Sequence, residues 1–495
     1  MERSAGILLP VFSLPGPYGI GSLGREARAF AEFLHNAGQR WWQVLPVGPT
    51  GAGNSPYTSE STFAGNPLLI DLEDLRDRVL LTEAELSAAR VPEGAPIDYA
   101  ALYESREALL RRAFSRLGGA EAQSVRDFAA ANPWLGEYAL YRALKARFGQ
   151  TAWFDWPDKD LLNHDPAALA AARQELAEDI AFHQAVQFWF FSQWKALKDH
   201  ANGLGVRIIG DLPIYVSLDS ADVWSERREF LLDKAGRPSR VAGVPPDYFS
   251  EEGQLWGNPL YDWDYHHATG YEWWGRRLAH ACTVYDVVRI DHFRGFESYY
   301  AIPAGEATAK NGVWRKGPGT DFVSAIRKKL PAARIIAEDL GYLTAEVKAL
   351  LEASGYPGMK VLQFAFDSRE GGDYMPHNYV RNSVAYTGTH DNTTTAAWQD
   401  QAAPADVALA RRYMACPEGD LTGAFIRTAL ACVSDTAIIP LQDWLGLGAE
   451  ARMNVPSQPQ GNWQWRMAPK ALSPELGRRI RELTGLYGRL PGKES

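Results

Sequence analysis

Cysteine, long apolar runs and surplus positive charge are all scarce in this sequence. Three cysteines, Cys282, Cys416 and Cys432, show no C-x-x-C spacing, so neither a disulfide framework nor a zinc site is indicated. No stretch has the length of a membrane span, and the first residues lack the apolar core and cleavage site of a signal peptide. We therefore expect a cytoplasmic protein with reduced thiols that does not enter a membrane.

The charge balance excludes further classes of partner. Lys and Arg number 51 against 60 Asp and Glu, a formal net charge of -9, which argues against nucleic acid and anionic membrane surfaces. A hydrophobic content of 46% with 22% charged residues permits a large core. Small neutral molecules remain as substrates. We expect no metal, no other cofactor, and a monomer or small homo-oligomer.

Tryptophan is the abundant residue that the composition does offer. There are 17, and many stand beside Gly, Pro, Asn or Asp, as Trp256, Trp263 and Trp463 do, which places them in loops. Sugar rings expose apolar C–H faces between hydroxyls, so a saccharide site combines flat aromatic rings with carboxylates and amides. The alternative is that these indoles fill the core.

Short runs rich in Val and Ile recur between longer helical patterns. Each run is continuously apolar rather than alternating, as in strands covered on both faces, and the strand–helix repetition favours an α/β fold, a (β/α)8 TIM barrel. No Gly-rich dinucleotide turn follows the first run, which argues against an open doubly wound sheet. The expected strands cover residues 41–47, 68–72, 206–216, 287–290, 334–337, 361–366, 384–387 and 437–441.

The spacing of these runs predicts one catalytic barrel over residues 1–495 with large insertions. Residues 75–200, dominated by Ala, Leu, Glu and Arg, are expected to form a mostly helical insertion between strands 2 and 3. Residues 217–286, rich in Trp, Tyr, Pro and Gly, are expected to form loops over the barrel mouth, including a lid at 245–259. Too few residues follow the eighth run for a C-terminal β domain.

Acidic residues stand at the ends of several expected strands. In barrel enzymes the chemistry lies at the carboxyl ends of the strands, and there the sequence places Asp211, Asp291, Glu338 and Asp391. Any one of them could instead cap a helix, and Arg289 with Asp291 could be a structural ion pair. Several carboxylates in one mouth repel one another, however, and stability alone does not explain that cost.

Glycosidic cleavage with retention needs such a set. One carboxylate acts as nucleophile and a second as proton donor, around an oxocarbenium-like transition state. Asp291 and Glu338 lie on neighbouring strands, and Arg289, two residues before Asp291, points to the same side and can hold that acid ionised. Glu338 has the longer arm and a negative neighbour that raises its pKa, so it is the better general acid.

Motifs in a fixed order run along nearly the whole chain. They are GILLP at 6–10, GIG at 19–21, QVLPV at 43–47, NSPY at 54–57, GDLPIY at 210–215, RIDH at 289–292, AEDLG at 337–341, THDN at 389–392, and PPDYFS at 245–250 with GQLWGNP at 253–259. This order resembles the α-amylase clan, and specifically its amylomaltase or 4-α-glucanotransferase family, whose members are (β/α)8 barrels acting on α-1,4-glucans. NVPS at 454–457 departs from the family pattern, which often has Gly after the Pro.

The resemblance implies a role for each matching residue. Asp291 would be the nucleophile, Glu338 the acid/base, and Asp391 the acid that binds sugar hydroxyls and stabilises the transition state. Tyr99 resembles a position that binds glucan away from the active site. A structural role is the alternative for His292, His390 and Asp339, and a functional role is favoured more for His390 than for His292. Substrate binding is implied for Tyr57, Ser55, Asp211, Tyr248, Gln254, Trp256, Arg289, His390 and Asn462.

The expected function is transfer of α-1,4-glucan segments between malto-oligosaccharides through a covalent glycosyl-enzyme, with cyclisation as its intramolecular form. A glucan hydrolase is the closest alternative, because it uses the same carboxylates with water as acceptor. The missing β domain and the motif at 245–259 favour transfer. A non-catalytic glucan-binding protein would have lost one of the acids, and all of them are present.

Overall fold

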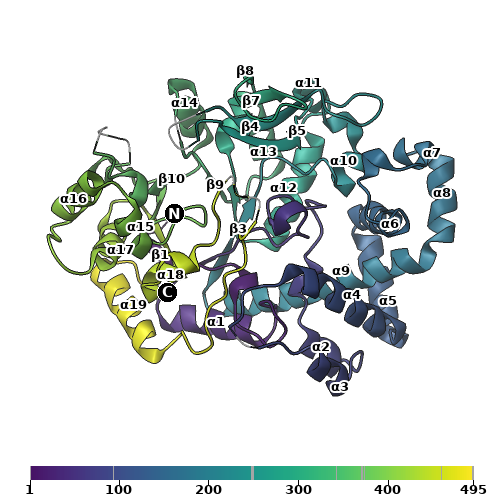
Figure 1. Ribbon diagram of the computed structural model, residues 1–495, viewed down its shortest axis with the longest axis horizontal. Coiled ribbons are helices and arrows are strands. Elements are labelled where there is room, and N and C mark those ends of the chain that lie inside the picture. The colour runs from purple at the N-terminus through teal and green to yellow at the C-terminus, as the bar shows by residue number, and fades with distance from the viewer. Residues whose placement is uncertain are drawn as a thin grey trace.

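Eight parallel strands form the centre of the computed structural model, which describes residues 2–92, 94–246, 250–341, 343–368, 372, 374–456, 458 and 460–492. Their order is β10-β11-β12-β1-β2-β3-β6-β9. The outermost strands meet where the Ala337 N–H donates to the Pro357 carbonyl at 2.9 Å, so the sheet is a nearly closed (β/α)8 barrel (Figure 1). The strands are β1 (Ser4–Leu8), β2 (Trp41–Gln43), β3 (Arg207–Leu212), β6 (Val287–Ile290), β9 (Ile335–Ala337), β10 (Gly358–Val361), β11 (Ser383–Tyr386) and β12 (Thr436–Pro440).

The barrel class is confirmed, but the strand at 68–72 is wrong. Pro67–Leu69 forms the 3-10 helix η3, and α2 begins at Leu72. Pro67 has no N–H for a sheet, and the Asn66 side chain caps the turn by accepting the Leu68 N–H. The strand that replaces it in the barrel is β1, which was not predicted because its residues, SAGIL, are mostly small. The run at 361–366 is also displaced, since β10 ends at Val361 and a 3-10 helix follows.

Each of the eight strands contributes to the packing inside the barrel. Small residues allow the strands to approach: a side chain on Gly6 would place its Cβ 2.4 Å from the Trp41 Cβ. Side chains from the strands fill the interior, so the barrel is a packed core and not a pore. The buried interior residues are Leu8, Trp41, Ile209, Val287, Ile336, Met359, Val361, Val384, Tyr386 and Ile438.

Helices fill the connection between β2 and β3 and stand to one side of the barrel, on the right in Figure 1. The longest, α9 (Ala177–Gly203), packs back onto the segment after β2. Its Gln187 amide accepts the Gly65 N–H at 2.7 Å and donates to the Gly65 carbonyl at 2.9 Å. The other helices are α2 (Leu72–Asp77), α3 (Glu83–Ala88), α4 (Tyr99–Ser115), α5 (Gly119–Ala131), α6 (Trp134–Arg147), α7 (Lys159–Leu162) and α8 (Pro166–Glu175).

A second sheet lies above the barrel in Figure 1, and two of its strands lie in the segment that was predicted to be rich in loops. Strands β4 (Arg240–Val244), β5 (Gln254–Pro259), β7 (Ser298–Pro303) and β8 (Val313–Lys316) pair antiparallel in the order β5-β4-β7-β8. The segment 217–286 thus contributes two strands, and it also contains α10 (Ala221–Ser225), α11 (Trp263–Ala268) and α12 (Glu272–Val284). The sheet was not predicted because β4 pairs with β7, and a barrel strand, β6, lies between the two in the sequence.

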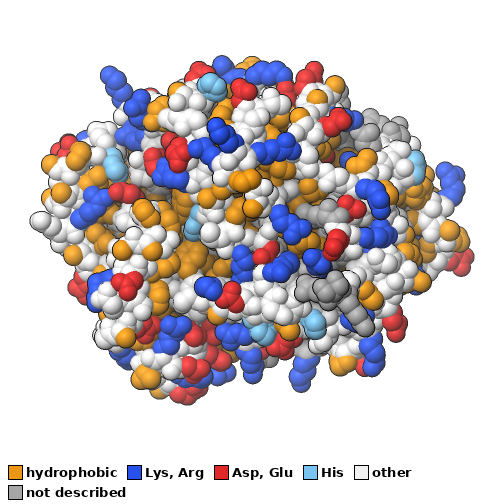
Figure 2. Space-filling model, turned by 180° about the vertical axis from the view of Figure 1, so that it is seen from behind, with side chains coloured by type: hydrophobic (Ala, Val, Ile, Leu, Met, Phe, Trp, Pro, Cys, Tyr) orange, Lys and Arg blue, Asp and Glu red, His pale blue; other side chains and the backbone are white. Residues whose placement is uncertain are grey.

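The remaining helices surround the barrel. After β12 the described residues contain α18 and α19 and no strand. No helix among the described ranges is both long and apolar enough to cross a membrane. On the face shown in Figure 2, basic side chains lie interspersed with acidic ones. These helices are α1 (Arg25–Asn36), α13 (Gly319–Lys329), α14 (Ala345–Ser354), α15 (Thr395–Gln401), α16 (Pro404–Tyr413), α17 (Leu421–Ala431), α18 (Leu441–Leu445) and α19 (Pro474–Leu486).

Arg489 joins the two ends of the chain. Arg489 follows α19 and is fully buried. Its planar guanidinium offers five N–H donors in a fixed geometry that lysine lacks. The fork reaches the start of β1 and the segment before β12, donating to the carbonyls of Leu430, Ser4, Asp435, Cys432 and Ser434 at 2.7–3.1 Å.

We expect Arg489→Met to lower the free energy of unfolding by about 3–4 kcal/mol, because several buried carbonyls lose their donor at about 1–3 kcal/mol each. Urea denaturation followed by circular dichroism measures the change. Arg478, with 68% of its side chain exposed, pairs with Glu475 on the surface. Arg478→Ala is the control and should cost less than about 0.5 kcal/mol. Equal losses of unfolding free energy in the two variants would show that the hydrogen bonds of Arg489 do not stabilise the fold.

Candidate active site

Strand ends bring three acids to one mouth. Asp211 is the next-to-last residue of β3, Asp291 directly follows β6, and Glu338 directly follows β9. In the register of the sheet Asp211 stands opposite Arg289, and β6 pairs in turn with β9. Because parallel strands present their carboxyl ends on the same side, these side chains converge.

Arg289 is the cation among these acids. Its Nη1 lies 2.6 Å from both carboxylate oxygens of Asp211 and 3.1 Å from Asp291 Oδ1. Burial disfavours the charged guanidinium, but Asp211 and Asp291 outweigh that effect and hold the pKa of Arg289 well above its ordinary value. A buried cation shared by two carboxylates fixes both of them and keeps negative charge in the mouth.

Hydrogen bonds to Glu338 surround Asp291 on both sides. The Glu338 N–H donates to the Ile290 carbonyl at 3.0 Å, and the Glu338 carbonyl accepts the Phe293 N–H at 3.0 Å. Its Oε2 accepts the His292 N–H at 2.6 Å, while Oε1 accepts the Leu340 N–H at 2.7 Å. The residues before and after Asp291 are therefore tied to Glu338, so the two carboxyl groups are neighbours.

The two neighbouring acids titrate abnormally. Burial raises the pKa of both Asp291 and Glu338, and Arg289 opposes the shift in each. Their environments differ, however. Asp291 contacts Arg289 directly and leaves 30% of its side chain exposed, whereas Glu338 is buried. Groups that interact this closely lose their protons as a pair.

Asp391 lies in the segment that follows β11. Its side chain is 47% exposed, and His390 Nε2 lies 3.4 Å from its Oδ2. Asn454 Nδ2 donates to Asp391 Oδ1 at 2.6 Å, and Arg452 donates to the Asp391 carbonyl at 2.9 Å. Neither Asn454 nor Arg452 was predicted, because they follow the last strand and occupy no strand end.

Tyr57 and His390 stack on each other. Their ring centroids lie 5.1 Å apart with the planes at 15°. The Ser55 hydroxyl accepts the Tyr57 N–H at 3.1 Å, so Ser55 shapes the turn that presents the ring. Burial raises the pKa of Tyr57, and its protonated hydroxyl donates to Asp211 at 2.6 Å. Burial lowers the pKa of His390, which favours the neutral imidazole.

Strand β5 brings Gln254 and Trp256 to the mouth. The two side chains lie on the same side of the strand, and Trp256 Nε1 donates to Gln254 Oε1 at 3.0 Å. The indole meets His292 edge to face at 4.8 Å. Burial, assisted by Arg294, lowers the pKa of His292 to about 3, in keeping with a neutral packing role. Tyr248, predicted beside them, lies outside the described residues.

Two predicted binding residues are engaged elsewhere. Asn462 uses its amide within its own loop, accepting the Val455 N–H at 2.9 Å and donating to the Gln458 carbonyl at 2.8 Å. Tyr99 is only 5% exposed, and its hydroxyl donates to the Trp463 carbonyl at 2.9 Å. The ring of Tyr99 is thus largely covered, and a second glucan site there stays a prediction.

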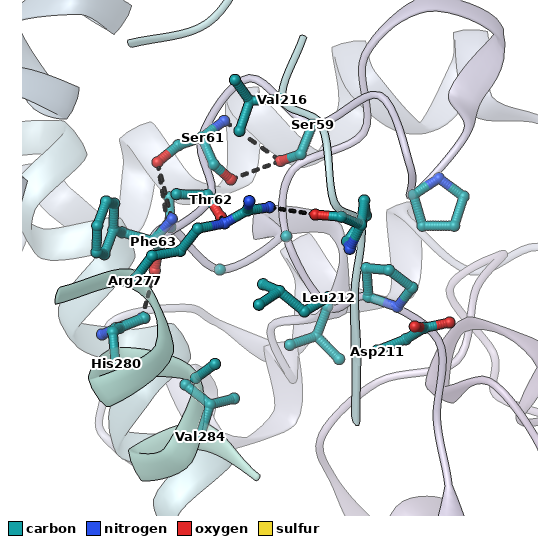
Figure 3. A pocket seen from close by; sticks show the side chains of 18 of the residues that line it. Ser59, Ser61, Thr62, Phe63, Asp211, Leu212, Val216, Arg277, His280 and Val284 are labelled. Atoms are coloured by element: carbon teal, nitrogen blue, oxygen red, sulfur yellow. Dashed lines mark hydrogen bonds between the residues drawn. The ribbon is translucent and has the colours of Figure 1, made fainter. Parts of the chain in front are cut away.

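A cavity lies behind Tyr57 and Asp211, between α12 and the turn at 59–63 (Figure 3). Arg277 and His280 project toward it from α12, as Figure 3 shows. The buried guanidinium of Arg277 donates to the Thr62 hydroxyl at 2.6 Å and to the carbonyls that follow β3, those of Pro213 and Ile214. Arg277 thus supports the mouth from behind. The part of the chain that the structure describes contains no group of three or more His, Cys, Asp or Glu arranged to hold a metal ion.

Comparisons with known proteins agree with this geometry. A family model described as 4-alpha-glucanotransferase matches residues 9–472. A 4-alpha-glucanotransferase of Thermus thermophilus is 48% identical over 99% of this chain and 100% of its own length, and one of Streptococcus pneumoniae is 44% identical over 99% and 98%. The solved amylomaltase from Streptococcus agalactiae, in complex with acarbose, is 40% identical with a TM-score of 0.96, covering 99% of this chain and 100% of that one. The chain belongs to the 4-alpha-glucanotransferase family.

Proposed function

We propose that the chain transfers α-1,4-glucan segments in two displacements, with Asp291 as nucleophile and Glu338 as acid and then base. Glucan transfer accords with family membership. The residue roles rest on one observation, that Glu338 is hydrogen-bonded on both sides of an Asp291 held by Arg289. Relatives that are 41–48% identical to this chain are named for transfer, which favours it over hydrolysis.

The first displacement breaks the glycosidic bond. The Asp291 carboxylate attacks the anomeric carbon, and Glu338 gives its proton to the departing glycosidic oxygen. The shorter glucan leaves with a free 4-hydroxyl, while the donor segment stays bound to Asp291 as an ester. In the second displacement Glu338 removes the proton of an acceptor 4-hydroxyl, whose oxygen attacks the same carbon and releases Asp291.

We infer that the single proton of this pair resides on Glu338. Asp291 contacts the Arg289 cation and is the more exposed of the two, and both features favour its ionised form. Burial and the neighbouring Asp339 carboxylate raise the pKa of Glu338 and favour its protonated form, against Arg289 and the N–H groups of Leu340 and His292. The two environments therefore separate the acid from the nucleophile, as retention requires.

The remaining side chains fit the sugar that carries the anomeric carbon. Tyr57 presents a partly buried ring, and Asp391 keeps a largely open carboxylate beside a neutral His390. A carboxylate that is both exposed and oriented by Asn454 can accept hydrogen bonds from sugar hydroxyls and stabilise positive charge at the anomeric carbon. Asp211 is already satisfied by Arg289 and Tyr57, so its part is to orient them.

Incubation with pure maltotriose tests the function. We expect the unmodified protein to produce glucose and a ladder of longer oligosaccharides. Asp291→Asn should lower the transfer activity by about 10⁴-fold or more, because the amide cannot form the ester. Chromatography of the products measures both. Unchanged circular dichroism guards against misfolding. If only shorter sugars accumulated, the protein would be a hydrolase.

Glu338→Gln should separate the two roles of the acid. With maltotriose we expect formation of the intermediate to slow by about 10²–10⁴-fold, because the leaving oxygen needs a proton. With α-glucosyl fluoride the same step should be nearly normal, since fluoride departs without one. A rapid-quench burst of fluoride release measures this step. Equal slowing with both donors would rule out a general-acid role for Glu338.

Trp256→Ala should raise the ratio of hydrolysis to transfer on maltotriose by about tenfold, because the indole covers the mouth beside His292 and its removal admits water. Released glucose and reducing ends give the ratio. Leu255→Ala is the matched control, since Leu255 is exposed on the opposite side of the same strand. If the ratio of hydrolysis to transfer were unchanged in both variants, Trp256 would not exclude water from the mouth.

A further inference from the structure

The backbone of Trp463 is strained. Its φ is +65°, in the left-handed region that large side chains rarely adopt. Two hydrogen bonds from distant segments hold it there. The Trp463 N–H donates to the Met453 carbonyl at 2.9 Å, and its carbonyl accepts the Tyr99 hydroxyl at 2.9 Å. The fold therefore maintains an unfavourable conformation at this residue, which calls for a reason.

The side chain supplies that reason. The indole is buried, with 4% of the residue exposed, and contacts both members of the stacked pair. Its centroid lies 5.8 Å from that of Tyr57 and 5.9 Å from that of His390, with tilts of 39° and 38°. The ring thus packs against two residues that face the sugar.

The same hydrogen bond orders the loop that reaches Asp391. Residues 453 and 463 are joined by the Trp463 N–H, and Asn462 ties the loop to Val455. Asn454, next to Met453, donates to Asp391 at 2.6 Å. Moving Trp463 therefore moves the support of Asp391 as well as that of Tyr57 and His390.

We propose that Trp463 is a positioning residue of the active site, whose left-handed backbone and buried ring fix the orientation of Tyr57, His390 and, through Met453, Asn454. The inference rests on the proposed function. Trp463 acts through these neighbours and does not itself contact the reacting atoms. A glycine would accept the same backbone without strain but would leave Tyr57 and His390 without their packing partner.

The protonation of His390 reports on this packing. The charged groups that act on the imidazole are Asp391, Arg289 and Asp211. Burial, together with Arg289, lowers its pKa and outweighs the two carboxylates, which raise it. If the indole is lost, water reaches the imidazole and its pKa rises toward the ordinary value near 6.5. The cation then forms at mildly acid pH, where the natural protein keeps a neutral ring.

The experiment compares Trp463→Leu with Trp156→Leu. Trp156 is also buried, but it packs on Tyr141 of α6 and Trp224 of α10. For Trp463→Leu we expect kcat on maltotriose to fall about 10–100-fold at pH 7 and further at pH 5.5, with the His390 titration midpoint raised in NMR spectra of histidine-labelled protein. His390→Gln assigns the signal. Trp156→Leu should lower Tm without changing either quantity.

Two milder variants keep the test decisive if Trp463→Leu does not fold. Trp463→Phe should recover much of kcat and the natural His390 midpoint, and Tyr99→Phe, which removes only the hydroxyl bond, should lower kcat severalfold at little cost in Tm. An unshifted His390 midpoint, or activity that fell only with the folded fraction, would overturn the proposal. Absence of transfer by the natural chain would instead refute the proposed function, and the His390 titration would still test the packing.

Discussion

The shared ion pair of Arg289 is the interaction on which the site depends. A buried guanidinium stabilises a protein only when its charge is matched, and here Asp211 and Asp291 match it at 2.6 and 3.1 Å. Asp291 is the more exposed of the two carboxylates, with 30% of its side chain open to solvent. Tyr57 is oriented through Asp211, and β3 is joined to β6 at the strand ends where the acids gather.

Much of this arrangement could be predicted because most of the barrel strands carry their own signal. The runs that end in Asp211, Asp291 and Glu338 are apolar, short and followed by an acid, and nothing beyond the local sequence is needed to recognise them. Strand β1 was missed because Ala, Gly and Ser carry little strand signal, although the Trp41 side chain against Gly6 makes small residues necessary there. The false strand at 68–72 shows the converse error, an apolar run that Asn66 and Pro67 turn into a helix.

What could not be predicted depends on contacts between residues far apart in the sequence. Asn454 matters because it meets Asp391, and Trp463 matters because it meets Tyr57 and His390. Neither residue lies in a motif whose spacing predicts a catalytic or binding role. Asn462, which the family resemblance did single out, closes a turn instead. In this structure the loop that bears these residues supports the side chains at the strand ends through hydrogen bonds and ring packing.

The position of β1 has a consequence for biosynthesis. This strand, made first, lies between β2 and β12, and β12 is made more than 400 residues later. A nascent chain can pair β1 with β2, but the other edge of β1 stays open until the last strand leaves the ribosome and Arg489 binds the Ser4 carbonyl. Open strand edges invite pairing with other chains. Synthesis of this barrel therefore includes a long interval in which the growing chain needs protection from its neighbours.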